Sequence, residues 1–334
     1  MKYKDFVYGD FKIKEPVFLE IIKSSPLQRL KKIDQAGYKP LYIKKDLRIK
    51  EENYNRFAHS VGVFLLLKKY NAPLEEQLIG LIHDVSHSCF SHAIDYILKE
   101  GSEKKHDLQD NIFDNFVKQS ELKNIIEKYG FDINYILDND NFPLEERDLP
   151  NLCADRIDYC LRDAFFLEEI TKKEKNFILD NLTTKDQKWI FKDLKSAQVF
   201  ASLFARMNKN HYAGLKSAIM FRVIGDLMKY TLKKEYINKK DLYTTDDQVI
   251  NKIKKYLEKD KTLRILWDRM NLKSKIINNP SDYDVKISCK SRIVDPLFFD
   301  KNNKIKKVSD INQKWKEKIK KELKPKVYFL KFKD

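Results

Sequence analysis

The sequence predicts a mainly α-helical protein that ends in a small C-terminal α+β segment. Apolar residues recur at helical spacing through most of residues 1–235. Beyond residue 235 shorter elements alternate, and strand-like runs at Val285–Ser288 and Val327–Phe332 flank a basic helical stretch. No internal repeat or low-complexity linker separates the two parts. We therefore expect a helical domain over 1–235 and a basic α+β segment over 236–334.

The first elements follow from local signals. Val7, Tyr8 and Phe11 surround Gly9, which predicts a short extended or hairpin element over the first 12 or so residues. Residues 15–35 have a helical pattern that breaks at Ser24-Ser25-Pro26. Proline is tolerated in the first turn of a helix, so we expect a second helix to begin there.

Further helices are predicted along the rest of the helical domain. They span Phe57–Lys69, Leu74–Leu98, His106–Val117, Glu121–Tyr129, Leu144–Glu168 and about Ser196–Leu232. Asn71-Ala72-Pro73 separates the first two of these helices, and Pro143 precedes the fifth. Lys188–Phe191 is rich in β-forming residues and predicts a brief strand before the last helix.

The glycine content restricts how this protein can bind phosphate. Only eight glycines occur among 334 residues, and their positions allow neither G-x-G-x-x-G nor G-x-x-x-x-G-K-[ST]. A glycine-rich loop that cradles phosphate is therefore excluded. If the protein handles phosphate, it must use side chains or a metal ion.

Membrane insertion and secretion are not expected. The longest uncharged apolar-rich run, Phe57–Leu67, is far shorter than the roughly 18 residues that a spanning helix needs. Residues 1–15 contain no apolar signal-peptide core. The four cysteines form no C-x-x-C pair, which favours free thiols in a reducing compartment. We therefore expect a cytoplasmic protein.

The net charge of +16 is concentrated near the end of the chain, where residues 301–334 hold 13 lysines and four acidic residues. One interpretation is a surface that binds nucleic acid. The interpretation we favour is a solvated helix, because Ile311, Trp315, Ile319 and Leu323 recur every four residues and would form one apolar face.

Histidines cluster in one part of the sequence. Five of the six lie between positions 59 and 106, namely His59, His83, His87, His92 and His106. A single histidine on an apolar helix is usually a hydrogen-bonded core residue, but here a histidine, a His-Asp pair and a later aspartate follow one another in helical contexts. Imidazole nitrogens and carboxylate oxygens together suit Mn, Fe, Co, Ni or Zn. Such an ion would also satisfy polar groups that are costly to bury alone.

Four motifs occur in a fixed order. They are Gln28-Arg29-Leu30 with Gln35 and Gly37, then Asn55-Arg56-Phe57-x-His59-Ser60-x-Gly62-Val63, then His83-Asp84-x-x-His87-x-x-Phe90-Ser91-His92, and then Asp155-Arg156-x-Asp158-Tyr159-x-x-Arg162-Asp163. In these motifs the sequence resembles the HD-domain metal-dependent phosphohydrolases, and within them the deoxynucleoside triphosphate triphosphohydrolase branch. The resemblance covers about residues 5–235 and implies an HD-domain helical core over 50–170.

The resemblance also implies the metal ligands. His59, His83, Asp84 and Asp155 would hold a divalent transition metal, with Mg²⁺ as an additional candidate. Asp155 is chosen over Asp158 because the first aspartate of the family pattern D-[KR]-x-D-Y binds the metal.

Other roles implied by the resemblance surround this centre. His92 would be the general acid that protonates the leaving 5′-oxygen, and His87 and His106 would lie near the phosphates. Asp95 lies three residues beyond His92, on the same helical face, and could orient its imidazole. The substrate-binding residues would be Arg56 and Arg156 at phosphate and Tyr159, Asp163 and Gln35 at the sugar, the last two at its 3′-hydroxyl.

The implied reaction is attack of metal-bound hydroxide on the α-phosphorus of a (d)NTP, which releases nucleoside and inorganic triphosphate. Three alternatives remain open at this point. The same site could act as a phosphatase or phosphodiesterase on a nucleoside monophosphate or signalling nucleotide, or as a nuclease on single-stranded nucleic acid. The chain could also be a non-catalytic nucleotide-binding module. The resemblance favours a homo-oligomer, either a dimer or a tetramer.

Overall fold

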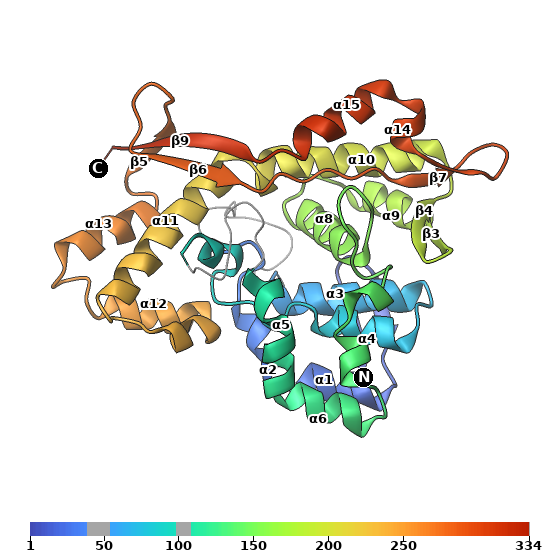
Figure 1. Cartoon of the computed structure of the whole chain (residues 1–334), viewed down its shortest axis with the longest axis horizontal. Coiled ribbons are helices and arrows are strands. Elements are labelled where there is room, and N and C mark those ends of the chain that lie inside the picture. The colour runs from blue at the N-terminus through green and yellow to red at the C-terminus, as the bar shows by residue number, and fades with distance from the viewer. Residues whose placement is uncertain (39–53, 98–107, 334) are drawn as a thin grey trace.

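A computed structural model describes residues 1–38, 54–97 and 108–333 of the chain (Figure 1). Helices make up most of these ranges, and small sheets occur mainly toward the C-terminal end, so the predicted fold class is confirmed. Within the described ranges, no helix combines the length and apolar character needed to cross a bilayer.

The N-terminal residues form the predicted hairpin and two short helices. Strands β1 (Lys2–Asp5) and β2 (Gly9–Lys12) pair antiparallel. Helix α1 (Pro16–Lys23) ends before Ser24, and α2 (Ser25–Arg29) begins there with proline in its first turn, as predicted. These elements bring Asp5 and Arg29 close to residues of the later motifs.

Helix α3 (Arg56–Lys69) is the central helix of the fold. Every residue from Arg56 to Leu67 is buried, and the helix packs against α4 (Leu74–Ile82) and α8 (Ala154–Phe166). The Asn55 side chain accepts a hydrogen bond from the Ala58 backbone N–H and so caps the first turn. The motif residues on α3 are therefore held in the interior.

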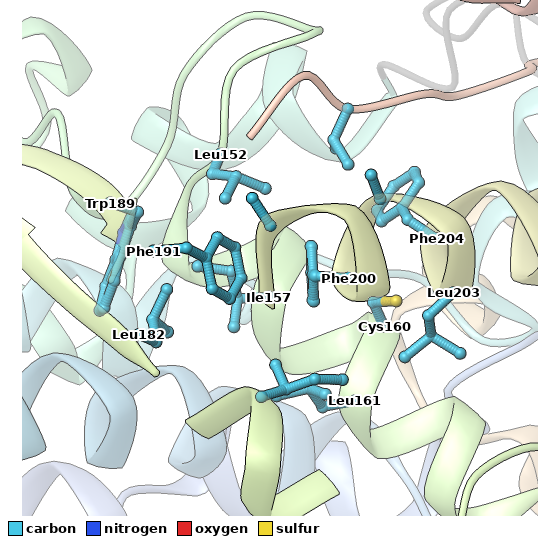
Figure 2. Packing of buried hydrophobic residues seen from close by; sticks show 14 of the residues in the cluster. Leu152, Ile157, Cys160, Leu161, Leu182, Trp189, Phe191, Phe200, Leu203 and Phe204 are labelled. Atoms are coloured by element: carbon cyan, nitrogen blue, oxygen red, sulfur yellow. The ribbon is translucent and has the colours of Figure 1, made fainter. Parts of the chain in front are cut away.

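Two groups of elements cover this centre on different sides. One group consists of α1, α2, α5 (Leu108–Gln119), α6 (Glu121–Lys128) and α7 (Ile133–Ile136), which share an apolar core with α3 and α4. The other consists of α8, α9 (Lys172–Asp180), α10 (Leu194–Met207) and strands β3 (Leu182–Lys185) and β4 (Lys188–Phe191). Figure 2 shows Ile157 of α8 packing among Phe191 of β4 and Phe200 of α10.

The C-terminal part contains further helices and two small sheets. Its elements are α11 (Leu215–Lys233), α12 (Asp246–Lys254), α13 (Lys261–Met270), β5 (Lys275–Asn278), β6 (Val285–Cys289), β7 (Leu297–Phe299), β8 (Ile305–Lys307), α14 (Val308–Ile311), α15 (Gln313–Glu322) and β9 (Lys326–Lys333). Strand β9 pairs antiparallel with β5 and β6, and β7 pairs parallel with β4. The pairing of β4 with β7 fixes the C-terminal part against the helical part (Figure 1).

Two predicted helices are shorter than expected. Helix α4 ends at Ile82, so the prediction of one helix over Leu74–Leu98 is wrong across the histidine motif. There the chain forms turns, and Phe90 (φ 57°) and Ser91 (φ 48°) adopt left-handed backbone conformations that an α-helix does not allow. The predicted helix over Leu144–Glu168 begins only at Ala154, because Pro150 cannot donate the backbone hydrogen bond that a helix interior requires.

The predicted helix over Ser196–Leu232 is interrupted. A π-helical turn at Asn208–Tyr212 separates α10 from α11. The buried Asn208 side chain hydrogen-bonds residues of the C-terminal part instead of facing solvent. The apolar face predicted near the end of the chain is also narrower than expected: Trp315 and Ile319 are buried, whereas Ile311 is 48% and Leu323 40% exposed.

Candidate metal centre and active site

Three helices bring the four predicted metal ligands together. His59 lies in the first turns of α3, His83 and Asp84 follow the last residue of α4, and Asp155 lies at the start of α8. His59 Nε2 is 3.2 Å from His83 Nε2 and 2.9 Å from Asp155 Oδ1. The Asp84 carboxylate lies 3.5 Å from His83 Nε2 and 3.7 Å from His59 Nε2. Two ring nitrogens and two carboxylates thus face one small region.

The chemistry of this donor set fits a cation. Burial lowers the pKa of His83, but the nearby Asp84 and Asp155 carboxylates outweigh that effect and raise it to about 10. The cluster therefore attracts positive charge strongly. A divalent ion between the four groups would neutralise the carboxylates and let both imidazoles coordinate in their neutral form.

Hydrogen bonds on the far side of each ring direct the Nε2 atoms toward this region. His59 Nδ1 lies 2.7 Å from Asp158 Oδ2, and His83 Nδ1 donates to the Gly80 carbonyl at 2.9 Å. Such partners fix the tautomer and orientation of histidines that ligate metals. Asp158 is fully buried and occupied by this contact, whereas Asp155 faces the Nε2 side.

Arg162 holds Asp158 in place. Its Nε and Nη2 atoms each lie 2.9 Å from a different Asp158 oxygen, and its Nη1 lies 3.0 Å from Asp5 Oδ2 on β1. Gly62 on α3 leaves room for this ion pair, because a Cβ atom there would overlap with Arg162 Nη2 and Asp158 Oδ1. Asp158, Arg162 and Gly62 belong to the sequence motifs, but sequence reasoning gave them no supporting role.

Arg56 and His87 surround Asp84. Arg56 Nη1 lies 2.8 Å from Asp84 Oδ2, and its Nε donates to Ser91 Oγ at 3.0 Å. His87 Nε2 lies 3.2 Å from Asp84 Oδ1. Burial and the positive charge of Arg56 lower the pKa of His87 to about 4, so this imidazole is neutral near pH 7.

The segment that begins at His83 continues to His92, whose side chain is partly accessible to solvent. Its Nδ1 lies 3.1 Å from Asp95 Oδ2, and the other Asp95 oxygen accepts the Leu108 backbone N–H at 2.9 Å. The rings of His87 and His92 are 5.0 Å apart and nearly perpendicular. His106 lies outside the described residues.

Two of the predicted sugar-binding residues, Tyr159 and Asp163, lie in a buried polar and aromatic region, where both contact Tyr212. The centroid of the Tyr159 ring lies 5.3 Å from that of Tyr212 and 5.9 Å from that of Phe204. The Tyr54 hydroxyl donates to Asp163 Oδ1 at 2.8 Å, and burial raises the pKa of Asp163 to about 6. Tyr212 was missed because its segment was predicted as uninterrupted helix.

Two buried polar atoms of predicted sugar-binding residues have no hydrogen-bond partner among the described residues. They are Gln35 Oε1 and the Tyr159 hydroxyl group. A buried polar atom without a partner costs free energy, so a bound ligand that supplied partners would be favoured here.

Arg156 is already paired in this structure. Its Nη2 lies 2.6 Å from Glu146 Oε1, and its Nη1 lies 2.9 Å from Cys153 Sγ. Glu146 was missed because it precedes α8 in a segment that was predicted as part of that helix. Arg156 directly follows Asp155 in the sequence, and its guanidinium group interacts electrostatically with the carboxylate of that candidate ligand.

Comparison with known proteins identifies the family. The HD domain model matches residues 56–163. YdhJ of Bacillus subtilis, which is uncharacterized, is 32% identical over 90% of this chain and 89% of its own length. A protein of Cordyceps militaris named metal-dependent phosphohydrolase cns2 is 31% identical over 68% of this chain and 66% of its own.

More distant relatives agree with this match. The chicken deoxynucleoside triphosphate triphosphohydrolase SAMHD1 is 27% identical over 75% of this chain, which spans only 39% of that protein. The crystal structure of a phosphohydrolase from Bacteroides thetaiotaomicron has the same fold, with a TM-score of 0.71, 16% identity and coverage of 100% of this chain and 99% of that one. The resemblance seen in the motifs is thereby confirmed, and the chain belongs to the HD-domain family of metal-dependent phosphohydrolases.

Proposed function

We propose that this protein hydrolyses ribo- or deoxyribonucleoside triphosphates to a nucleoside and inorganic triphosphate, at a divalent metal held by His59, His83, Asp84 and Asp155. The observation that carries the proposal is the convergence of two imidazole nitrogens and two carboxylates, with Nε2 of His59 and His83 only 3.2 Å apart. This donor set suits Mn, Fe, Co, Ni or Zn.

A divalent ion bound there supplies a Lewis acid that polarises the phosphoryl group and lowers the pKa of coordinated water. The Asp158 carboxylate and the Gly80 carbonyl hydrogen-bond Nδ1 of His59 and His83, so Nε2 of each ring would be available to bind the ion. Histidines that bind metals generally have such a hydrogen-bond partner at the other ring nitrogen.

His92 would hold the proton that the leaving group needs. In the proposed reaction water loses a proton to solvent as its oxygen bonds the α-phosphorus, the bond between phosphorus and the 5′-oxygen breaks, and the His92 proton goes to that oxygen. His92 then regains a proton from solvent. The hydrogen bond between His92 Nδ1 and Asp95 Oδ2 would hold the ring in one orientation for this transfer. Nucleoside and triphosphate then leave as separate products.

The remaining predicted residues would position the substrate. Arg56 and Arg156 would neutralise phosphate oxygens, with His87 beside them, and a role of His106 there stays a prediction. Asp163 and Gln35 would bind the 3′-hydroxyl, and Tyr159 would contact the sugar. Among the residues that the structure describes, the buried Gln35 oxygen and Tyr159 hydroxyl have no hydrogen-bond partner, which supports this assignment because a sugar hydroxyl would supply one.

The names of two relatives support the reaction class and the substrate. The Cordyceps relative is named a metal-dependent phosphohydrolase, and the chicken relative a deoxynucleoside triphosphate triphosphohydrolase. Location in the cytoplasm, a homo-oligomeric state and nucleic-acid binding by the basic surface stay predictions of the sequence.

A product assay tests the proposal. Purified protein is incubated with Mn²⁺ and a panel of NTPs, dNTPs and oligonucleotides, and the products are separated by chromatography. We expect nucleoside and triphosphate in equal amounts from the wild type and none from Asp84→Asn. Asp114→Asn, which changes an exposed carboxylate on α5, should retain activity. Orthophosphate or cleaved oligonucleotide as the only product would favour another phosphoester substrate.

A further inference from the structure

The segment that follows β6 presents two cations on one side. From Cys289 to Ile293 burial alternates: Cys289, Ser291 and Ile293 are buried, whereas Lys290 and Arg292 are half-buried. Side chains of an extended chain point alternately to opposite sides. Lys290 and Arg292 therefore project in the same direction, away from the core that holds their neighbours.

Hydrogen bonds and packing anchor this segment next to the candidate active site. The Asn208 carboxamide accepts the Arg292 backbone N–H at 2.9 Å and donates to Ser291 Oγ at 3.0 Å. Ile293 lies in the same apolar cluster as Ile157 of α8. Figure 1 shows the chain between β6 and β7 running alongside α10, where the π-helical turn places Asn208.

The two cations act on groups of the candidate active site. Lys290 interacts electrostatically with Arg292, Arg156, Asp110 and Glu146. Arg292 is the strongest charged neighbour acting on the Tyr159 hydroxyl. Burial and the neighbouring Arg292 lower the pKa of Lys290 to about 8, as expected where cations are crowded together. Crowded cations are unfavourable unless an anion lies between them.

The charge balance leaves Lys290 and Arg292 available for such an anion. Glu146 is already paired with Arg156 at 2.6 Å. Desolvation and the neighbouring carboxylates, Glu146 first among them, raise the pKa of Asp110 to about 6, although Lys290 acts in the opposite direction. Among the described residues, neither Lys290 nor Arg292 has a carboxylate oxygen within salt-bridge distance of its charged group. If a metal neutralised Asp84 and Asp155, the positive charges of Lys290, Arg292 and Arg156 would outweigh the remaining negative charge around Lys290.

We propose that Lys290 and Arg292, together with Arg156, form a phosphate-binding subsite by which the C-terminal segment selects substrates that carry a polyphosphate chain. The proposal deepens the proposed function and rests on it for the position of the scissile phosphate. The metal centre would hold the α-phosphate, and the subsite would hold phosphates farther along the chain. A nucleoside triphosphate would fill both, whereas a monophosphate would fill only the metal centre.

Direct binding of an inorganic probe tests this subsite. The full chain is loaded with Mn²⁺, and tripolyphosphate and orthophosphate are titrated in separately by calorimetry. In the Lys290→Met/Arg292→Gln variant we expect the Kd for tripolyphosphate to rise at least about tenfold, since each charge-assisted hydrogen bond contributes more than a neutral one. The Kd for orthophosphate should change less than about threefold. Lys316→Met, which removes an exposed charge from α15, is the matched control.

Several results would overturn the subsite. They are absence of tripolyphosphate binding to the wild type, an unchanged Kd in the folded double variant, or an equal loss in Lys316→Met, which would reflect overall charge alone. If the double variant does not fold, Lys290→Met alone provides the same comparison, with an expected rise of about threefold or more. Hydrolysis is scored separately: a wild type that releases no triphosphate contradicts the proposed function, whereas an unchanged Kd beside normal hydrolysis contradicts only the subsite.

Discussion

His59 Nδ1 lies 2.7 Å from Asp158 Oδ2, on the side of the imidazole ring opposite the other candidate metal ligands. This contact separates the functions of the two aspartates at the start of α8. Asp155 lies on the Nε2 side, where a metal would bind, and Asp158 supports the ring from behind. Spacing in the sequence could not distinguish them, because both aspartates lie within the same short motif.

The role of Asp158 predicts a loss of metal affinity without a loss of fold. Asp158→Asn retains an oxygen that can accept hydrogen bonds from His59 and Arg162, but it removes the negative charge behind the ring. Replacing such a supporting group typically weakens metal binding about 10- to 100-fold. Competition with a chelator measures the affinity, and circular dichroism checks the fold. Unchanged affinity in a folded variant would show that Asp158 does not support the metal centre.

The packing around Gly62 predicts a large difference between two glycine substitutions. In Gly62→Ala the new methyl group would overlap the buried Arg162–Asp158 pair, so we expect the free energy of unfolding to fall by at least about 3 kcal/mol. In Gly225→Ala the nearest atom would lie 3.4 Å away, in ordinary contact. That helical substitution should be neutral or stabilise by up to about 1 kcal/mol. Urea unfolding measures both, and similar values for the two would contradict the close packing.

The buried Asp163 carboxyl predicts a pH-dependent effect on stability. Its pKa is raised from 3.8 to about 6 in the folded protein, so the folded state binds the proton more tightly than the unfolded state. The stability that this proton contributes is complete below pH 3.8 and is lost as the pH rises through 6, at a cost of about 3 kcal/mol above that range. Asp163→Asn removes this dependence.

The Asp163→Asn variant should therefore gain stability over the wild type between pH 5 and pH 8, by about 1 to 2 kcal/mol. Denaturant unfolding at the two pH values measures the change. Asp114→Asn, on the exposed face of α5, should show no such difference. A gain that is equal at both pH values would mean that Asp163 does not titrate in this range.

The position of His92 predicts a catalytic defect without metal loss. Removing a general acid typically lowers kcat about 10²- to 10⁴-fold, so His92→Gln should show a loss of that size. Its bound metal should equal that of the wild type, because His92 lies beyond the converging ligand atoms and pairs with Asp95. Steady-state kinetics and elemental analysis on the same preparation separate the two effects. Metal loss in this variant would instead place His92 among the ligands.

The sequence predicted elements with strong local signals and failed where tertiary contacts decide. Helix α3 and strand β4 were predicted to within a residue at each end, because apolar pattern, flanking residues and capping agree there. The prediction of a helix over Leu74–Leu98 is wrong from His83 onward. The turns there are stabilised by contacts with distant segments, which the local apolar pattern cannot reveal. Arg29, for example, donates to the carbonyl oxygens of Val85 and His87 from a distant segment.

The candidate site shows the same division. The candidate ligands could be predicted because they lie in motifs that resemble those of a known family, although only the structure shows that Asp155 and Asp158 face opposite sides of His59. Tyr212 and Lys290 carry no local signal of a site role. They reach the site through the π-helical turn and the segment after β6, which depend on the packing of residues far apart in the sequence.

Elemental analysis of purified protein is the measurement that tests the central claim most directly. We predict that the wild type and His92→Gln bind a divalent transition metal in stoichiometric amount, and that His83→Ala and Asp155→Ala lose it while remaining folded. Metal content in folded His83→Ala or Asp155→Ala equal to that of the wild type would contradict the assignment of these side chains as the metal centre.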